Sequence, residues 1–272
     1  MHVLTEIVFD FTSFFAVATA LVLSHELGHY LAARANGVRV DVFSIGFGPE
    51  LVGRNDRAGT RWKLCAIPLG GYIKMFGEDD PSLDERNRAV SFQGKGLGRR
   101  AIIAVAGPLA NFVFAALLIA ALIAFLGASR GVSFSIAGAA LLLCKAIALT
   151  WQLVVGTAAA VTHFLLGAHG PHQLVGPIRL AQVTGTFAHK GILVLTGVTA
   201  ILSVNLGVTN LLPIPSLDGG HLLFYLAEAV RGRPVGKQTE TYAMRIGLFL
   251  VITLLALGTW NDLVHFGILG LA

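Results

Sequence analysis

Residues 7–33 read IVFDFTSFFAVATALVLSHELGHYLAA, a stretch that is long and apolar enough to cross a membrane. A helix of about 20 mainly apolar residues spans the roughly 30 Å hydrocarbon core of a bilayer. His25, Glu26 and His29 lie near the end of this stretch, shortly before Arg34. Ionisable side chains are costly inside a membrane and usually mark function. The stretch therefore predicts a membrane helix that carries a functional site.

The rest of the chain is apolar in the same way, with 55% hydrophobic and only 13% charged residues. Typical soluble domains carry about 25% charged residues. Three further stretches predict membrane-spanning helices, at residues 101–126, 192–229 and 246–266. The third contains Pro213 and Pro215, so we expect part of it to be unwound where it lines a cavity or is buried in protein. The expected fold is a polytopic α-helical membrane protein with four transmembrane helices, forming a single domain over residues 1–272.

A fifth apolar stretch, residues 136–166, is ambiguous. Hydropathy alone predicts a span, but Lys145, Gln152 and His163 weaken that prediction. A single additional crossing would also reverse the direction of the 192–229 helix. We therefore expect residues 127–190 to form an interfacial helical segment on the outer side.

Basic residues indicate the orientation. Residues 34–100 hold 12 of the 20 Lys and Arg residues, and a second basic cluster lies between the third and fourth predicted spans. The positive-inside rule places both regions in the cytoplasm and both termini outside. These flanks account for the net charge of +5. The chain lacks a compact Lys/Arg cluster with interleaved aromatics, so we expect no nucleic-acid partner.

The first basic region contains a predicted β-region at residues 38–76. Its two halves are rich in β-branched and aromatic residues, and Asn55-Asp56-Arg57-Ala58-Gly59 between them is a turn signal. We expect a small sheet on the cytoplasmic side, associated with the membrane.

The motif His25-Glu26-Leu27-Gly28-His29 has the form H-E-x-x-H. Residues four apart share one face of a helix, so both imidazoles can bind one metal ion, with Glu26 beside them as a base for water. The alternative is a set of polar residues that hold helices together. The motif thus favours a metal site.

A catalytic zinc site usually has three protein ligands and one open position. The candidate third ligand is Asp218, which follows the two prolines and would lie in the cytoplasmic half of the membrane, as His25 would. The alternative is that Asp218 caps a helix at the proline break. Considered alone, the residue type does not separate these two roles.

These motifs resemble the bacterial site-2 protease family, of the regulator-of-sigma-E protease type. The resemblance covers nearly the whole chain. It is carried by His25-Glu26-Leu27-Gly28-His29, Gly46-Phe47-Gly48-Pro49, Gly70-Gly71-Tyr72-Ile73-Lys74-Met75, Gly107-Pro108-Leu109-Ala110-Asn111-Phe112, Ser203-Val204-Asn205-Leu206-Gly207 and Leu217-Asp218-Gly219-Gly220. Longer members of that family carry one or two PDZ domains after the second helix. Here that interval is short, so the PDZ region is either naturally absent or has been removed.

The resemblance implies a Zn²⁺ ion held by His25, His29 and Asp218, with Glu26 as the general base. It also associates Asn210 and Pro213 with the substrate, although Asn210 could equally be a structural amide that caps the broken helix. We further predict that an edge strand binds the unwound substrate backbone by strand addition. The residues of that edge are Gly71, Tyr72, Ile73, Lys74 and Met75.

The expected function is zinc-dependent cleavage of transmembrane helices in single-pass proteins within a bacterial inner membrane, as in regulated intramembrane proteolysis. The resemblance implies substrates such as anti-sigma factors or remnant signal peptides. Two alternatives remain: a helix-binding pseudoprotease and a metal transporter. Glu26 favours the enzyme, because a site that only binds has no need of a general base. The sequence indicates no oligomeric state.

Overall fold

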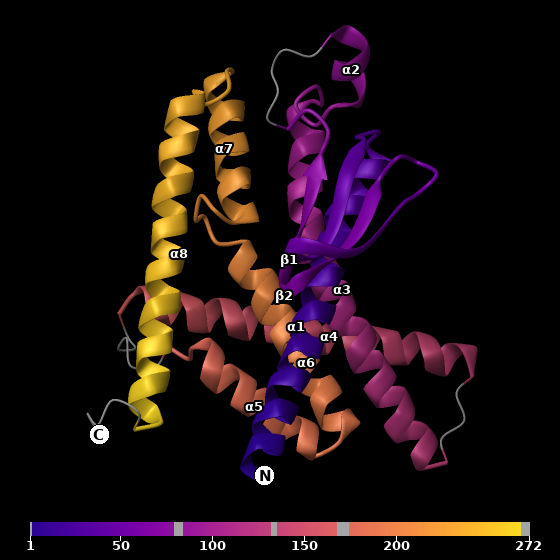
Figure 1. The fold of residues 1–272 in the computed structure, drawn as a ribbon. Coiled ribbons are helices and arrows are strands. Elements are labelled where there is room, and N and C mark those ends of the chain that lie inside the picture. The colour runs from indigo at the N-terminus through magenta and orange to yellow at the C-terminus, as the bar shows by residue number, and fades with distance from the viewer. Residues whose placement is uncertain (1, 79–83, 132–134, 168–173, 268–272) are drawn as a thin grey trace. The chain divides into compact units, whose positions relative to one another are not determined.

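The computed structural model describes residues 2–78, 84–131, 135–167 and 174–267, which form helices and one small sheet (Figure 1). In chain order the elements are α1 (His2–Ala35), β1 (Val40–Asn55), β2 (Arg61–Met75), α2 (Glu85–Val90), α3 (Leu97–Ser129), α4 (Ile136–Leu165), α5 (Pro177–His189), α6 (Ile192–Asn210), α7 (Asp218–Arg231) and α8 (Lys237–His265).

Among the described residues, five helices are long and apolar enough to cross a membrane: α1, α3, α4, α6 and α8. The prediction of a polytopic helical membrane protein is confirmed, but the predicted number of four spans is wrong. The additional candidate is α4, which the sequence analysis assigned to the interface. Lys145 and His163 do not interrupt this helix, and its most apolar part is as apolar as that of α8. The surrounding apolar residues thus outweigh the isolated polar ones.

The predicted third span, residues 192–229, is two helices rather than one. α6 ends at Asn210, a turn follows, and α7 begins at Asp218. Pro213 and Pro215 lie in this turn, because proline has no N–H for a helical hydrogen bond. The turn is tight: a side chain at Gly219 would overlap the carbonyl oxygens of Leu211 and Leu212. The expected unwinding is therefore confirmed, and it places Asp218 at the start of a new helix.

One compact unit comprises Met1–Val17, Phe112–Val208 and Ile246–Ala272. Its core contains Ala115, Ala200 and Val204, whose small side chains let α3 and α6 approach closely. The fully buried carboxylate of Asp262, in α8, accepts hydrogen bonds from the backbone N–H groups of Gly176 and Arg179, each 2.9 Å long. These bonds fix the beginning of α5.

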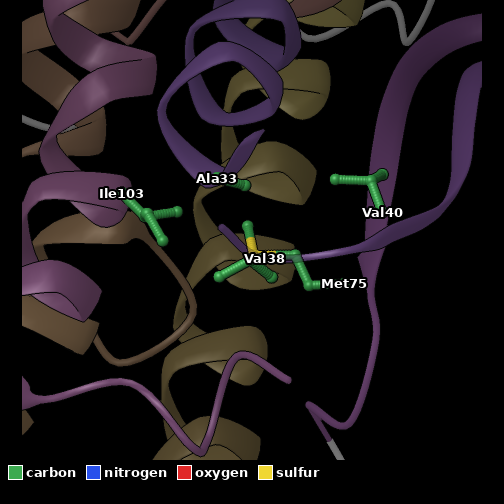
Figure 2. Packing of buried hydrophobic residues seen from close by; sticks show 5 residues of the cluster. All are labelled: Ala33, Val38, Val40, Met75 and Ile103. Carbon is green, nitrogen blue, oxygen red and sulfur yellow. The ribbon is translucent and has the colours of Figure 1, made fainter. Parts of the chain in front are cut away.

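The second compact unit comprises Ala18–Asn111 and Thr209–Arg245. Figure 2 shows its apolar core, in which Ala33, Val38, Val40, Met75 and Ile103 come from α1, the loop after it, β1, β2 and α3. Because Met75 and Ile103 share this core, the end of β2 is held against α1 and α3. The packing fixes the strand close to the H-E-x-x-H motif.

The two strands form an antiparallel pair in which Val40 lies opposite Met75 and Asn55 opposite Arg61. The carboxylate of Asp56 stabilises the turn by accepting hydrogen bonds from Trp62 Nε1 and from the N–H groups of Ala58 and Thr60; these bonds lower its pKa. The predicted β-region is therefore confirmed.

Within the described residues, the register gives the segment 71–75 a strand partner on one side only. Phe43 is opposite both Ile73 and Trp62, because β1 pairs with both ends of β2. The segment 61–64 has partners in both halves of β1, whereas 71–75 pairs only with 40–45. The segment 71–75 is thus an edge, as the sequence analysis predicted.

Candidate metal centre

His25 and His29 lie one helical turn apart on α1, and both are buried, with 9% and 8% of their surfaces exposed. Their Nε2 atoms are 3.2 Å apart. The helical repeat of 3.6 residues places side chains at i and i+4 on the same face. Both imidazoles therefore direct their Nε2 atoms toward the same point.

Asp218 completes this cluster. Its Oδ2 lies 3.1 Å from Nε2 of His25, and its Oδ1 lies 3.3 Å from Nε2 of His29. Among the described residues, these three side chains form the one group of three or more His, Cys, Asp or Glu whose ligand atoms converge, all within 4.8 Å of one another. The turn that contains Pro213 and Pro215 brings Asp218 to this position.

The alternative role of Asp218 as a helix cap does not match the geometry. The N-cap of α7 is Leu217, which makes no side-chain hydrogen bond to the helix. Asp218 is the first helical residue, and its carboxylate oxygens face the two histidines. The carboxylate is thus directed at the cluster rather than at the backbone N–H groups of α7.

α3 orients both imidazole rings. Nδ1 of His29 lies 2.8 Å from the carbonyl oxygen of Ile103, and Nδ1 of His25 lies 3.3 Å from Nδ2 of Asn111. Gly107, on the same helix, leaves room for the His29 ring, because a side chain there would overlap it. With their Nδ1 atoms engaged by α3, both rings direct Nε2 toward Asp218.

Glu26 lies beside the cluster and lines the same cavity, which has a volume of about 310 Å³. It packs near β2, since a side chain at Gly71 would meet Cγ of Glu26 at 3.4 Å and the carbonyl oxygen of Ser44 at 2.7 Å. The absence of a side chain at Gly71 thus lets the edge strand approach the helix that carries Glu26.

The cavity includes some of the residues predicted to bind substrate and omits others. Tyr72, Ile73, Met75 and Asn210 line it. Gly71, Lys74 and Pro213 do not line it, and the side chain of Lys74 is exposed. Lys74 lies between Ile73 and Met75, which contribute to the wall, but its own side chain is exposed and does not.

Several residues of the centre were not predicted from the sequence. They include Ile103 and Asn111, which contact the histidines, and Glu78, Phe92, Ser216 and Tyr225, which line the cavity. Asn111 was detectable as a lone amide in an otherwise apolar stretch. The other contacts depend on how the helices and strands pack.

The donor set suits zinc. Two imidazole nitrogens and one carboxylate are a common ligand set for catalytic zinc, which keeps a fourth position for water or substrate. The ligand atoms are buried yet open onto a cavity. The residues present therefore fit the Zn²⁺ ion that the sequence analysis expected.

The fold and this centre together are those of a membrane metalloprotease. A family model described as peptidase family M50 matches residues 13–254. A protein of Rhizobium meliloti named as a zinc metalloprotease is 32% identical over 92% of this chain and 95% of its own length. A protein of Agrobacterium fabrum with a similar name is 32% identical over 92% and 94%. The metalloprotease MmpA of Caulobacter vibrioides is 28% identical over 91% and 93%.

This chain belongs to peptidase family M50 and is a zinc metalloprotease of the membrane. The expected enzyme class and cofactor are thereby confirmed. The three alignments run over 356, 357 and 371 positions, although this chain has 272 residues. These relatives therefore contain internal residues that have no counterpart here.

Proposed function

We propose that this protein is an intramembrane endopeptidase that hydrolyses peptide bonds in the transmembrane helices of single-pass proteins. The observation that supports this most strongly is the position of His25, Glu26 and His29 within α1, a candidate membrane span. A protease whose site lies in such a helix acts on bonds that reach membrane depth. The substrates we propose are membrane anchors such as anti-sigma factors or remnant signal peptides.

The chemistry follows from the residues around the cavity. His25, His29 and Asp218 would hold zinc, which supplies Lewis acidity to activate water and to polarise a carbonyl group. Glu26 takes a proton from the attacking water and delivers it to the leaving amine. Asn210, at the end of α6, lines the same cavity and can donate its amide N–H to the substrate backbone.

The substrate must unwind before it is cut, because a helix keeps its backbone groups hydrogen-bonded to one another. Unpaired backbone groups are expensive in a membrane. The edge at residues 71–75 can pair with an extended substrate segment, since its partners in the described sheet lie on one side only. Tyr72 and Ile73 also line the cavity, so this edge lies close to the catalytic groups.

We further propose an orientation for the chain, in which the basic loops at residues 34–100 and 231–245 lie in the cytoplasm. α1 and α6 each begin in the first compact unit and end in the second, whereas α3 and α8 run in the opposite sense. α4 belongs wholly to the first unit. With the basic loops inside, the active site lies in the cytoplasmic half of a bacterial inner membrane and both termini lie outside.

The length of the alignments supports a compact form of the site-2 protease without its PDZ region. In the part of the interval between α3 and α5 that the structure describes, the one helix is α4. The internal residues that the relatives add have no counterpart in this chain. In this proposal no PDZ domain covers the outer face.

The proposal is tested with purified full-length protein and a panel of truncated membrane helices, with the products identified by mass spectrometry. We expect cleavage within the helices that stops with a zinc chelator and returns with added zinc. A pseudoprotease would bind these helices without producing fragments. A transporter would move zinc across vesicles and leave the helices intact.

A further inference from the structure

Asn111 is a buried polar side chain that the proposed reaction does not use. It lies on α3, is 0% exposed, and places its Nδ2 atom 3.3 Å from Nδ1 of His25. Burying an amide among apolar groups is unfavourable unless the amide forms hydrogen bonds. The contact with His25 therefore suggests a function for this residue at the metal centre.

His25 needs a specific tautomer to bind a metal. Its Nε2 atom is the one that faces Asp218 and His29, at 3.1 and 3.2 Å. A neutral imidazole that binds a metal through Nε2 carries its proton on Nδ1. The group beside Nδ1 must then accept a hydrogen bond.

The Nδ1 atoms of the two histidines have different neighbours. His29 faces the carbonyl oxygen of Ile103 at 2.8 Å, and a backbone carbonyl can only accept. His25 faces the side-chain amide of Asn111. An amide can present either its oxygen or its nitrogen, because a half-turn about the Cβ–Cγ bond exchanges the two atoms. Only the orientation with Oδ1 toward His25 is compatible with Nδ1–H.

We propose that Asn111 is a positioning residue for the metal centre: its amide oxygen accepts the Nδ1–H of His25 and holds that ring in the tautomer that presents Nε2 to zinc. This inference rests on the proposed zinc site of His25, His29 and Asp218. Groups that orient metal-binding histidines in this way typically contribute about 10–100-fold to metal affinity. We expect an effect of this size, on zinc binding itself.

The experiment measures the zinc dissociation constant of the full-length protein by competition with a chelator. Asn111→Leu has a similar volume and no acceptor, and we expect it to bind zinc about 10–100-fold more weakly. Asn111→Asp has the same shape and can only accept when ionised, so we expect it to bind zinc within about tenfold of wild type. Thermal unfolding of the chelator-treated proteins reports any loss of packing separately.

Wild-type affinity in Asn111→Leu would overturn the proposal, because packing alone would then orient His25. Equal weakening in Asn111→Leu and Asn111→Asp would also overturn it. If the Leu variant does not fold, Asn111→Asp decides: a loss well beyond about tenfold contradicts the acceptor role.

The wild-type protein and Asp218→Ala separate this inference from the proposed zinc site. Zinc binding that is absent in wild type, or unchanged in Asp218→Ala, contradicts the site itself. Binding that Asp218→Ala loses and Asn111→Leu keeps contradicts only the role of Asn111.

Discussion

The Oδ2 atom of Asp218 lies 3.1 Å from the Nε2 atom of His25, so the first residue of α7 meets the H-E-x-x-H face of α1. This contact joins two segments that are far apart in the sequence. It depends on the proline-containing turn that ends α6 and starts a new helix at Asp218.

Asp218→Ala should weaken zinc binding, because it removes one of the three proposed ligands. We expect the loss in a zinc dissociation constant measured against a chelator. His221→Ala is a matched control, since His221 lies one turn further along α7 and also lines the cavity. An unchanged affinity in Asp218→Ala would require a different third ligand.

Gly107→Ala should displace the His29 ring and reduce both zinc binding and stability. The added methyl group would overlap that ring, and overpacking of this kind typically costs about 1–3 kcal/mol. Gly98→Ala is the control on the same helix, because nothing lies within 4 Å of a side chain there. Thermal unfolding and zinc affinity would report the difference, and equal behaviour of the two variants would refute the close packing.

Ile73→Pro should slow cleavage of helical substrates while zinc remains bound. Proline removes a backbone N–H from the 71–75 edge, so strand addition by the substrate is impaired. Ile73→Ala keeps the N–H and shortens the same side chain, which separates the two effects. Turnover of the proline variant equal to that of the alanine variant would argue against substrate binding at this edge.

The protein should also cleave substrates that retain a folded ectodomain. The proposed outer face carries no PDZ domain, so little of it can exclude a bulky substrate on steric grounds. The measurement compares one substrate helix with and without its ectodomain, alongside a relative that contains a PDZ domain. If this protein preferred the trimmed form as strongly as that relative does, a part of the fold other than a PDZ domain would have to exclude the bulky substrate.

Local patterns in the sequence predicted the parts of the site that lie on one element. The helical repeat placed His25 and His29 on one face, and the prolines predicted the break before Asp218. The interfacial assignment of α4 went against its hydropathy, because too much weight was given to a few isolated polar residues in a long apolar helix.

Contacts between different helices and strands could not be predicted from the sequence. The carbonyl oxygen of Ile103 and the amide of Asn111 reach the histidines only because α3 packs against α1 in one particular register. The pocket-lining side chains Phe92 and Tyr225 come from two further segments. No periodicity or motif reports a distance between such segments, so these neighbours appear only once the fold is known.

The most direct test of the proposed mechanism is Glu26→Gln, assayed for both zinc content and peptide cleavage. Glu26 is proposed to transfer protons and not to bind the metal, and general bases typically contribute about 10²–10⁴-fold to rate. We therefore expect about one zinc per chain, as in wild type, with cleavage of a helical substrate reduced by about 100-fold or more. Cleavage within about tenfold of wild type, with zinc retained, would contradict Glu26 as the general base.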